Sequence, residues 1–324
     1  MRDAFAKTIT ELGPKDPQLV LLSGDIGNRM FDKFKEAQPA RFYNCGVAEA
    51  NMISVAAGLA MTGFRPWVYT IASFLTYRPF EQIRVDVAYH HLPVVLVGTG
   101  AGLCYASNGP THHTLEDIAL YRALPGMVIA CPGDAFEVTA CMRELQKHTS
   151  GPAYLRLGKK GEPKVHAAVP ELPIGVAHEM RKGRDAVFLT TGNMLHDTLV
   201  ACDRLRERGI DAGLWHFPWV QPIDTRALEL AFASAPLVVS VEEHSVDGGF
   251  GSLVAEWRAG QSQGGRLLRC GVPRRFIHET TEQEHARTMC GLDPEGLAAQ
   301  VVAALEGRTS TLPLSALATH HSHG

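Results

Sequence analysis

Apolar positions along the first half of the chain fall into short β-rich runs that alternate with segments of helical spacing. The runs predict strands at 19–25, 67–71, 93–100, 127–134 and 153–157. The segments between them predict helices near 2–12, 47–62, 76–90, 114–123 and 134–147. Strands that are apolar on both faces and separated by helices are typical of a parallel sheet covered on both sides. We therefore expect a three-layer α/β/α domain over residues 1–160.

A stretch rich in Pro, Gly and Lys interrupts this alternation and predicts a linker over 161–183. Beyond it the alternation resumes, with strands expected at 186–193, 212–217 and 237–243 and helices near 195–209, 249–259 and 294–306. This pattern predicts a second, smaller three-layer α/β/α domain over 184–307. The last residues, 308–324, lack periodicity and include several histidines, so we expect a disordered tail.

The composition narrows the classes of function. The 324 residues carry a formal net charge of −3, which gives no basic surface for nucleic acid or for an anionic membrane. No apolar run approaches the roughly 18–20 residues needed to cross a bilayer. The seven cysteines show no C-x-x-C spacing. This argues against a disulfide framework or a zinc site and favours a reduced, cytoplasmic location.

Glu49 is the single charged residue in the stretch 43–63. The only polar residue over 52–61 is Ser54, so we expect this helix to be buried on all sides. A carboxylate near its N-terminus can simply favour the helix dipole. Alternatively, it is a buried carboxyl that shares a proton with a ligand. Spacing alone leaves both interpretations open.

Three aromatic residues follow the strand expected at 67–71. Phe74, Tyr77 and Phe80 recur at intervals of three and would form one stripe on a helical turn. Such a stripe is typical of a packed core, and it also suits the stacking of a flat heterocycle.

A glycine-rich stretch, GTGAGLCYASNGPTHHTLED, begins where the strand at 93–100 ends. In open α/β sheets ligands bind at this edge, and glycines let the backbone approach a ligand closely. Thr114 and Asp117 resemble a capping box, which would put His112 and His113 just before a helix N-terminus. A histidine there can donate to an oxyanion or move a proton, although loop histidines without a role are also common.

Five stretches of the chain form a pattern together: GVAEANM, SFLTYRPFEQIR, NGPTHHTLEDIALYR, CPGD and VSVEEHSVDGGFGS. In this order and spacing they resemble the C-terminal half of transketolase, the thiamine diphosphate enzyme that moves a two-carbon ketol unit between sugars. The resemblance extends over residues 1–307. It implies a pyrimidine-binding domain, then a transketolase C-terminal domain, and a transferase activity.

The resemblance assigns roles around the cofactor. In this family the glutamate that matches Glu49 hydrogen-bonds the N1′ nitrogen of the aminopyrimidine ring, and His112 matches a catalytic histidine. The aromatics around the ring match three residues, Phe74, Tyr77 and Phe80. Tyr77 is the one expected to stack on the ring. Two further positions match a segment that lies against the cofactor, Asp25 and Ile26.

One part of the family's cofactor site is missing from this sequence. Thiamine diphosphate enzymes hold the diphosphate through Mg²⁺, using a G-D-G motif followed by an asparagine, and no G-D-G occurs here. The resemblance therefore implies a split enzyme, in which an N-terminal transketolase subunit supplies the diphosphate-binding domain and the metal. We expect an α2β2 heterotetramer with the active site between subunits and with no metal held by this chain.

The substrate side departs from the sugar enzymes. Gly100 stands where split transketolases have a histidine, and Asn108 stands where they have an aspartate that reads the stereochemistry of the sugar. A site discriminates hydroxyls through such bonds, and asparagine donates where an ionised aspartate only accepts. We therefore expect an unusual donor or acceptor, such as a keto acid or a modified sugar. Drift in an ordinary sugar enzyme is the other interpretation. His113, often glutamine in the family, is a further candidate substrate contact.

Three cationic residues are candidates for binding an anionic substrate group. Arg2 matches an arginine of the family's acceptor phosphate site. Lys159 replaces a second arginine, which keeps the charge but loses the bidentate fork. Arg29 occupies a position usually held by a small hydroxyl residue. A phosphorylated or carboxylated acceptor fits this set.

Other functions share parts of the pattern. The β subunit of a 2-oxo-acid dehydrogenase has the same domain plan and the glutamate, but it lacks P-T-H at 110–112. Deoxyxylulose-phosphate synthase shares more of the pattern but is normally one chain with its own diphosphate domain. A non-catalytic scaffold paralogue would explain the changes at Gly100 and Asn108, but not the presence of Glu49.

Overall fold

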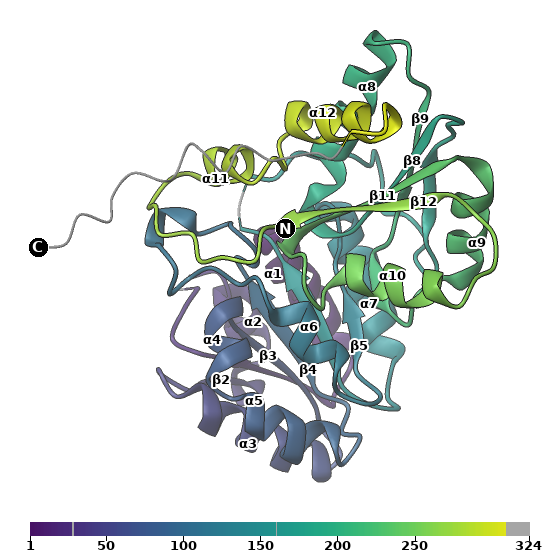
Figure 1. The fold of residues 1–324 in the computed structure, drawn as a ribbon. Coiled ribbons are helices and arrows are strands. Elements are labelled where there is room, and N and C mark those ends of the chain that lie inside the picture. Colours follow the sequence, from purple (N-terminus) through teal and green to yellow (C-terminus); the bar gives the residue numbers. More distant parts are fainter. Residues whose placement is uncertain (28, 160, 309–324) are drawn as a thin grey trace, which may run out of the picture.

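Two β-sheets, each with helices on both faces, form the molecule (Figure 1). The computed structural model describes residues 1–27, 29–159 and 161–308. The first half of the chain builds one sheet and the second half builds the other. One strand from the second half, β10 (Trp219–Gln221), joins the sheet of the first half. The expected fold class, two three-layer α/β/α domains, is confirmed.

The first sheet has seven strands in the order β10-β5-β6-β4-β3-β1-β2. Their bounds are β1 (Leu19–Ser23), β2 (Phe42–Asn44), β3 (Arg65–Ile71), β4 (Val95–Thr99), β5 (Val128–Ala130), β6 (Ala153–Leu157) and β10 (Trp219–Gln221). Paired strands are parallel except β10 and β5, which are antiparallel. Because β10 comes from the second half of the chain, the two domains share a sheet edge.

Helices cover both faces of this sheet. One face is packed by α1 (Arg2–Leu12), α2 (Asp32–Ala37) and α7 (Ala135–Lys147). The other face is packed by α3 (Glu49–Met61), the π-helical turn η3 (Ile83–Ala88) and α6 (Asp117–Arg122). Two short helices, α4 (Ala72–Tyr77) and α5 (Phe80–Gln82), follow β3. The sheet is thereby dry on both faces, as the continuous apolar strands predict.

The second sheet has five strands in the order β12-β11-β8-β9-β7. They are β7 (His178–Arg181), β8 (Ala186–Thr190), β9 (Ala212–His216), β11 (Leu237–Ser245) and β12 (Arg266–Val272). One face is packed by α8 (Leu195–Glu207), α11 (Gln283–Met289) and α12 (Pro294–Leu305). The other is packed by α9 (Thr225–Ser234) and α10 (Phe250–Ala259). The antiparallel edge strand β7 lies at the end of the segment expected as a linker.

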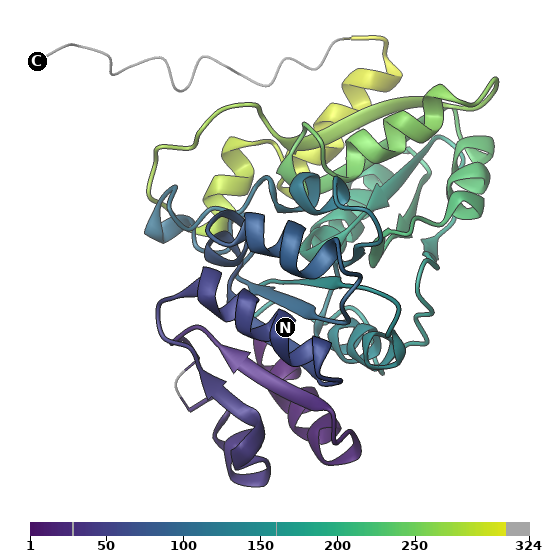
Figure 2. The ribbon, with the colours of Figure 1, turned by 90° about the horizontal axis from the view of Figure 1, so that it is seen from below.

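One apolar core joins the two domains. It runs from α3 and α6 on the first sheet to α9 and α10 on the second. Seen from below in Figure 2, the green and yellow second domain lies against one end of the purple and blue first domain. The loops at the carboxyl ends of the first sheet's strands are therefore held by both domains.

The helix expected over 76–90 is interrupted in the structure. α4 ends at Tyr77, and Pro79 precedes α5, which runs into the π-helical turn. Proline has no N–H to donate and clashes with the preceding turn, so a break at this point is its ordinary effect. The prediction of one continuous helix was wrong for this reason.

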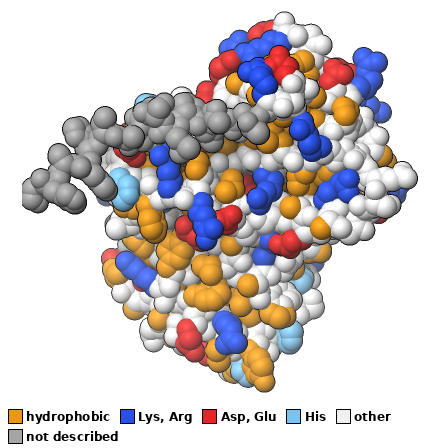
Figure 3. Space-filling model, in the orientation of Figure 1, with side chains coloured by type: hydrophobic (Ala, Val, Ile, Leu, Met, Phe, Trp, Pro, Cys, Tyr) orange, Lys and Arg blue, Asp and Glu red, His pale blue; other side chains and the backbone are white. Residues whose placement is uncertain are grey.

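The prediction that α3 is buried on all sides was also wrong. Its side chains at 52, 53, 56 and 57 are buried, but Val55 and Met61 are 42% and 59% exposed. The exposed face of α3 also carries the polar side chains of Asn51 and Ser54. Figure 3 shows apolar side chains gathered over the lower part of the molecule, where α3, α4 and α5 lie in Figure 1. Exposed apolar side chains gathered on one face make it a candidate interaction surface.

Within the described residues, none of the helices has the length and apolar character required to traverse a lipid bilayer. The tail expected over 308–324 lies, apart from Arg308, outside the described residues.

Candidate active site

The carboxyl ends of β1 to β4 bring the candidate residues to one edge of the first sheet. Asp25 follows β1, Glu49 begins α3 shortly after β2, Phe74 lies in α4 after β3, and Gly100 follows β4. Parallel sheets place their ligand sites at this edge. The sequence order of the motifs thus becomes a spatial cluster.

Glu49 is buried at the N-terminus of α3, with only 4% of its side chain exposed. Nη1 of Arg78 lies 2.8 Å from each of its carboxylate oxygens. The helix dipole also favours a negative charge at this end. Both interpretations of Glu49 remain compatible with this position, because the carboxylate has a dipole, a cation and an adjacent aromatic surface.

That aromatic surface is Phe74. The Arg78 guanidinium carbon lies 4.0 Å from the centre of the Phe74 ring, a cation–π contact. The His112 ring meets Phe74 edge to face, with 5.1 Å between ring centres. A flat group carrying N–H donors therefore fits between Glu49 and Phe74. Sequence reasoning missed Arg78, which looks like an ordinary helix arginine.

Tyr77 and Phe80 make contacts of their own in this structure. The phenol of Tyr77 donates to the Glu116 carboxylate, and burial raises the Tyr77 pKa, with that hydrogen bond raising it further. Phe80 packs on the apolar core beside α3. The break at Pro79 separates Phe80 from Phe74 and Tyr77, which both lie in α4. Phe74 is the ring that contacts Arg78, the partner of Glu49.

His112 lies half-buried in the loop after β4. Its Nδ1 is 3.0 Å from the hydroxyl of Thr111. Burial lowers the pKa of His112, and the charge of Arg78 lowers it further. The imidazole is therefore neutral at neutral pH, which lets it accept a proton from a substrate hydroxyl or pass one back.

His113 is buried beneath the same loop. Burial lowers its pKa, against the opposing effect of a hydrogen bond to the Ala106 backbone. Its Nε2 is buried without a partner. Asn108 is exposed at the end of a short 3₁₀ turn, η4 (Ala106–Asn108). The two residues therefore differ in access, and only Asn108 faces solvent.

The expected capping box is absent. α6 begins at Asp117 with Glu116 as its N-cap, and the hydroxyl of Thr114 has no partner. The Asp117 carboxylate instead accepts from the Arg156 guanidinium and from the Tyr154 phenol, each at 2.7 Å. The Asp117 carboxylate, expected to cap the helix, therefore forms a buried salt bridge instead.

Tyr105 is a site residue that the sequence did not reveal. Its ring lies against Gly100 and meets His112 edge to face, with 6.2 Å between ring centres. Burial raises the pKa of Tyr105, while the adjacent Arg2 guanidinium, which also hydrogen-bonds it, lowers the pKa. Arg2 is in turn next to Lys159, because the Arg2 N–H donates to the Lys159 carbonyl at 3.3 Å. The main chains of two of the three expected cationic residues are thus adjacent.

The remaining candidates lie at the end of β1. Asp25 is exposed, adopts a positive φ of 42° and accepts from the Asn44 amide at 2.9 Å. Ile26 packs against the core. Arg29 is exposed with a φ of 65°. Non-glycine residues with positive φ are uncommon and concentrate at functional sites. Among the described contacts, none joins Arg29 to Arg2 or Lys159.

A set of buried charges fixes the loop that carries His112. We call it the clamp: Asp117, Arg156, Glu243 and Arg287. The Leu103 N–H donates to the Glu243 carboxylate at 2.8 Å, and Arg287 pairs with the same carboxylate. Arg156 also donates to the Glu243 carbonyl at 3.0 Å. The second domain thereby holds the loop of the first domain that carries His112.

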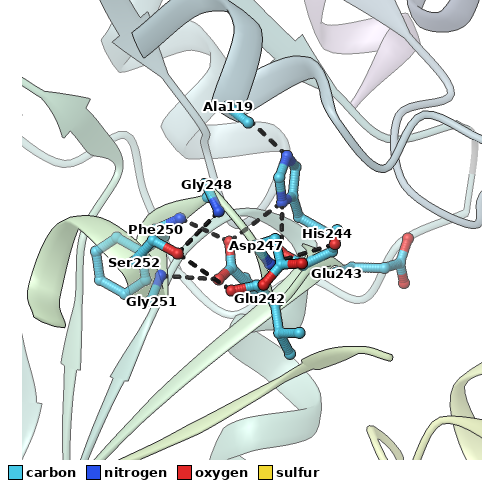
Figure 4. A network of polar contacts seen from close by, with 12 residues as sticks. Ala119, Glu242, Glu243, His244, Asp247, Gly248, Phe250, Gly251 and Ser252 are labelled. Carbon is cyan, nitrogen blue, oxygen red and sulfur yellow. Dashed lines mark hydrogen bonds and ion pairs between the residues drawn. The ribbon is translucent and has the colours of Figure 1, made fainter. Parts of the chain in front are cut away.

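Around Glu243, the strand β11 and the backbone at the start of α10 lie very close together. Glu242 accepts the N–H groups of Phe250 and Gly251 at 2.7 and 2.8 Å, which anchors the start of α10 (Figure 4). A methyl group on Gly251 would come within 2.7 Å of the Ser240 hydroxyl. Burial raises the pKa of Glu242, with His244 and these two amides opposing the rise. The E-E-H…G-G-F-G motif therefore has a structural role here.

Across the part of the chain that the structure describes, no group of three or more His, Cys, Asp or Glu residues is arranged to hold a metal ion. The chemistry available at this edge comes from one buried carboxylate, one neutral imidazole, an aromatic wall and nearby cations.

Comparison with known proteins gives this arrangement a context. Residues 1–163 match the pyrimidine binding domain of transketolase, and residues 175–297 match the transketolase C-terminal domain. A transketolase C-terminal section of Methanocaldococcus jannaschii is 35% identical over 305 residues, covering 93% of this chain and 95% of that protein. A 1-deoxy-D-xylulose-5-phosphate synthase of Syntrophotalea carbinolica is 35% identical over 301 residues. That match covers 92% of this chain but 47% of the longer protein.

A solved structure shares the fold over nearly the whole chain. It is a split gene transketolase in an inactive β4 tetramer, 33% identical, with a TM-score of 0.87 over 94% of this chain and 98% of that chain. Both domain matches are to transketolase domains, which favours this family over the β subunit of a 2-oxo-acid dehydrogenase. With matching domains, matching order and a carboxylate at the expected sheet edge, the chain belongs to the transketolase family.

Proposed function

We propose that this chain is the C-terminal subunit of a two-component enzyme that transfers a two-carbon ketol or related acyl unit with thiamine diphosphate. The observation that carries the proposal is the buried Glu49 carboxylate, whose partner Arg78 lies on the face of the Phe74 ring. In this structure the half-exposed Arg78 pairs with that carboxylate, and the family to which the chain belongs depends on a cofactor with a flat aminopyrimidine ring that would take the place of Arg78. We place the enzyme in the cytoplasm.

The position of Arg78 tests whether such a ring fits. The guanidinium is flat, carries N–H donors, reaches both oxygens of Glu49 and lies on the face of Phe74. An aminopyrimidine is also flat and carries N–H donors, so the residues present fit the group once Arg78 turns aside. Glu49 and Phe74 would hold the ring, with Asp25 and Ile26 at the end of the neighbouring strand. When bound, thiamine diphosphate would supply a nucleophilic carbon for breaking and forming carbon–carbon bonds.

The remaining side chains have roles toward the substrate. His112, neutral because burial lowers its pKa, would exchange a proton with a substrate hydroxyl or carbonyl oxygen. Arg2 and Lys159 supply positive charge for an anionic group on the substrate. Exposed Asn108 and Arg29 are candidate contacts at the rim, whereas the buried His113 would act by supporting the loop.

The site requires a second protein. The chain has no G-D-G motif, so an N-terminal transketolase subunit would supply the diphosphate-binding domain and Mg²⁺, in an α2β2 heterotetramer. The exposed apolar side chains of α3 and its surroundings, Val47, Val55, Met61 and Tyr89, support such an interface, because monomeric proteins rarely leave a contiguous apolar face uncovered.

The substitution Glu49→Gln tests the proposal in the assembled pair. It keeps the shape of the side chain but removes its ability to take and release a proton. We expect kcat for two-carbon transfer to fall by about 100-fold or more, the range for removing a positioned acid–base group. Glu36→Gln, on the exposed surface of α2, is the matched control and should leave kcat unchanged. Unchanged activity of Glu49→Gln in the assembled pair would contradict a catalytic role for Glu49.

A further inference from the structure

The space at the end of β4 is filled by Tyr105. Gly100 has a φ of 72°, and a methyl group built on it would come within 2.7 Å of the Tyr105 Cζ and closer still to two other ring carbons. No side chain at position 100 is compatible with the ring where it lies. The absence of a side chain at Gly100 therefore leaves no gap in the surface of the site, because the Tyr105 ring covers Gly100.

The Tyr105 ring bridges two functional groups. Its edge-to-face contact with His112 places one side of the ring at the proposed proton-transfer group. Its hydroxyl interacts with Arg2, which adjoins Lys159 through a backbone hydrogen bond. A substrate that reaches from His112 to the Arg2 cation therefore passes along the Tyr105 ring.

The chemistry of that wall is selective. An aromatic face gives a favourable apolar contact to C–H groups but offers no hydrogen-bond partner to a hydroxyl lying on it. A hydroxyl that loses water without gaining a partner is disfavoured by about 10-fold in binding. Gly100, with no side chain, supplies no alternative partner. The positive charges of Arg2 and Lys159 favour a substrate that has an anionic group at its far end.

We propose that Tyr105 is the specificity-determining residue of this site and that it selects anionic substrates lacking a hydroxyl on the carbon that lies against its ring. This inference rests on the proposed transfer function. It names the class as short, deoxygenated aldehydes or ketones with a phosphate or carboxylate at the far end. The same geometry makes the Tyr105 ring, where it lies, dependent on a glycine at position 100.

A matched pair of acceptors tests the proposal in the assembled enzyme, with hydroxypyruvate as the two-carbon donor. Glyceraldehyde 3-phosphate carries the hydroxyl, and 3-oxopropyl phosphate is its deoxygenated counterpart with the same charge and length. We expect the unmodified enzyme to prefer 3-oxopropyl phosphate by about 10-fold in kcat/KM. The preference should lie mainly in KM.

Three variants separate the ring from its hydroxyl. Tyr105→Ala should reduce the preference to about 1. Tyr105→Phe keeps the ring and should keep the preference, while KM rises for both phosphates because the link to Arg2 is lost. Gly100→His combined with Tyr105→Gly should invert the preference. Circular dichroism of each variant verifies that it is folded.

The outcomes are distinct. A preference of the unmodified enzyme for glyceraldehyde 3-phosphate, or an equal preference in the folded Tyr105→Ala and Tyr105→Phe variants, would overturn the role of Tyr105 alone. Failure of the unmodified assembly to transfer a two-carbon unit to either acceptor would overturn the proposed function and this inference with it.

Discussion

Two arginine–carboxylate pairs in the first domain have the same chemistry but differ in their exposure to solvent and in their other contacts. Arg156 and Asp117 are 5% and 0% exposed, and the same guanidinium also donates to the carbonyls of Thr114 and Glu243. Arg78 is 45% exposed and pairs with Glu49 through one nitrogen, with an aromatic face as its other contact. The first pair is buried and makes further hydrogen bonds to the backbone, whereas the second leaves the guanidinium half in solvent.

This difference separates structure from function. A buried arginine paired with a buried carboxylate cannot leave without exposing an unpaired charge, so Arg156 holds the loop that carries His112 in place. A half-exposed arginine can turn into water at small cost. Arg78 can therefore give way to a ligand that offers Glu49 and Phe74 the same contacts. Arg78 can be replaced by a ligand, while the buried charges of the clamp keep the rest of the site in place.

The largest effect is expected from breaking the clamp. Arg156→Met leaves Asp117 buried without its cation, and loss of one partner of a buried pair costs about 3–5 kcal/mol. The unfolding midpoint in urea, followed by circular dichroism, should fall accordingly. Arg184→Met, at a highly exposed ion pair with Asp211, is the control and should leave the midpoint unchanged. A small shift for Arg156→Met would show that the clamp does not hold the loop.

A smaller effect is expected from the exchangeable pair. Arg78→Met removes the group that competes for Glu49, so thiamine diphosphate should bind the assembled enzyme about two- to fivefold more tightly, the worth of a partly exposed ion pair. Calorimetric titration measures this change. Weaker binding in the variant would mean that Arg78 contacts the bound cofactor instead of making way for it.

The smallest effect concerns pH. Burial and, to a lesser extent, the charge of Arg78 lower the pKa of His112, so its neutral form persists below the ordinary value of 6.5. Arg78→Met removes the second cause only. The acid limb of the kcat/KM profile should therefore move to higher pH by less than about one unit. A shift to lower pH, or none, would contradict the placement of Arg78 beside His112.

The fold was predictable where the chain is apolar on both faces. The apolar runs at β1, β4 and β6 predict buried parallel strands, and the segments of helical spacing between them predict the connecting helices. β10 escaped prediction because it has three residues and pairs in the other domain's sheet. β12 escaped because it is an edge strand with exposed arginines at 266 and 269. Periodicity reports burial, and these strands are short or half exposed.

The site was predictable only in part, for a related reason. Glu49 stood out because a charge in an apolar stretch is unusual. Arg78 did not, because nothing in a helix-like sequence shows which arginine turns inward. Tyr105 was hidden because its importance lies in the space above Gly100, which only the fold defines. Residue types reveal candidate chemistry, but contacts between loops decide which of them meet.

The most direct test of the shared site is a calorimetric titration of thiamine diphosphate and Mg²⁺, first into this chain alone and then into the chain mixed with its natural partner subunit. We predict binding only in the mixture, with Glu49→Gln weakening it and Glu36→Gln leaving it unchanged. Tight binding to this chain alone would contradict the proposal that the partner supplies the diphosphate and metal site. Absence of binding in both titrations would contradict a cofactor role for Glu49.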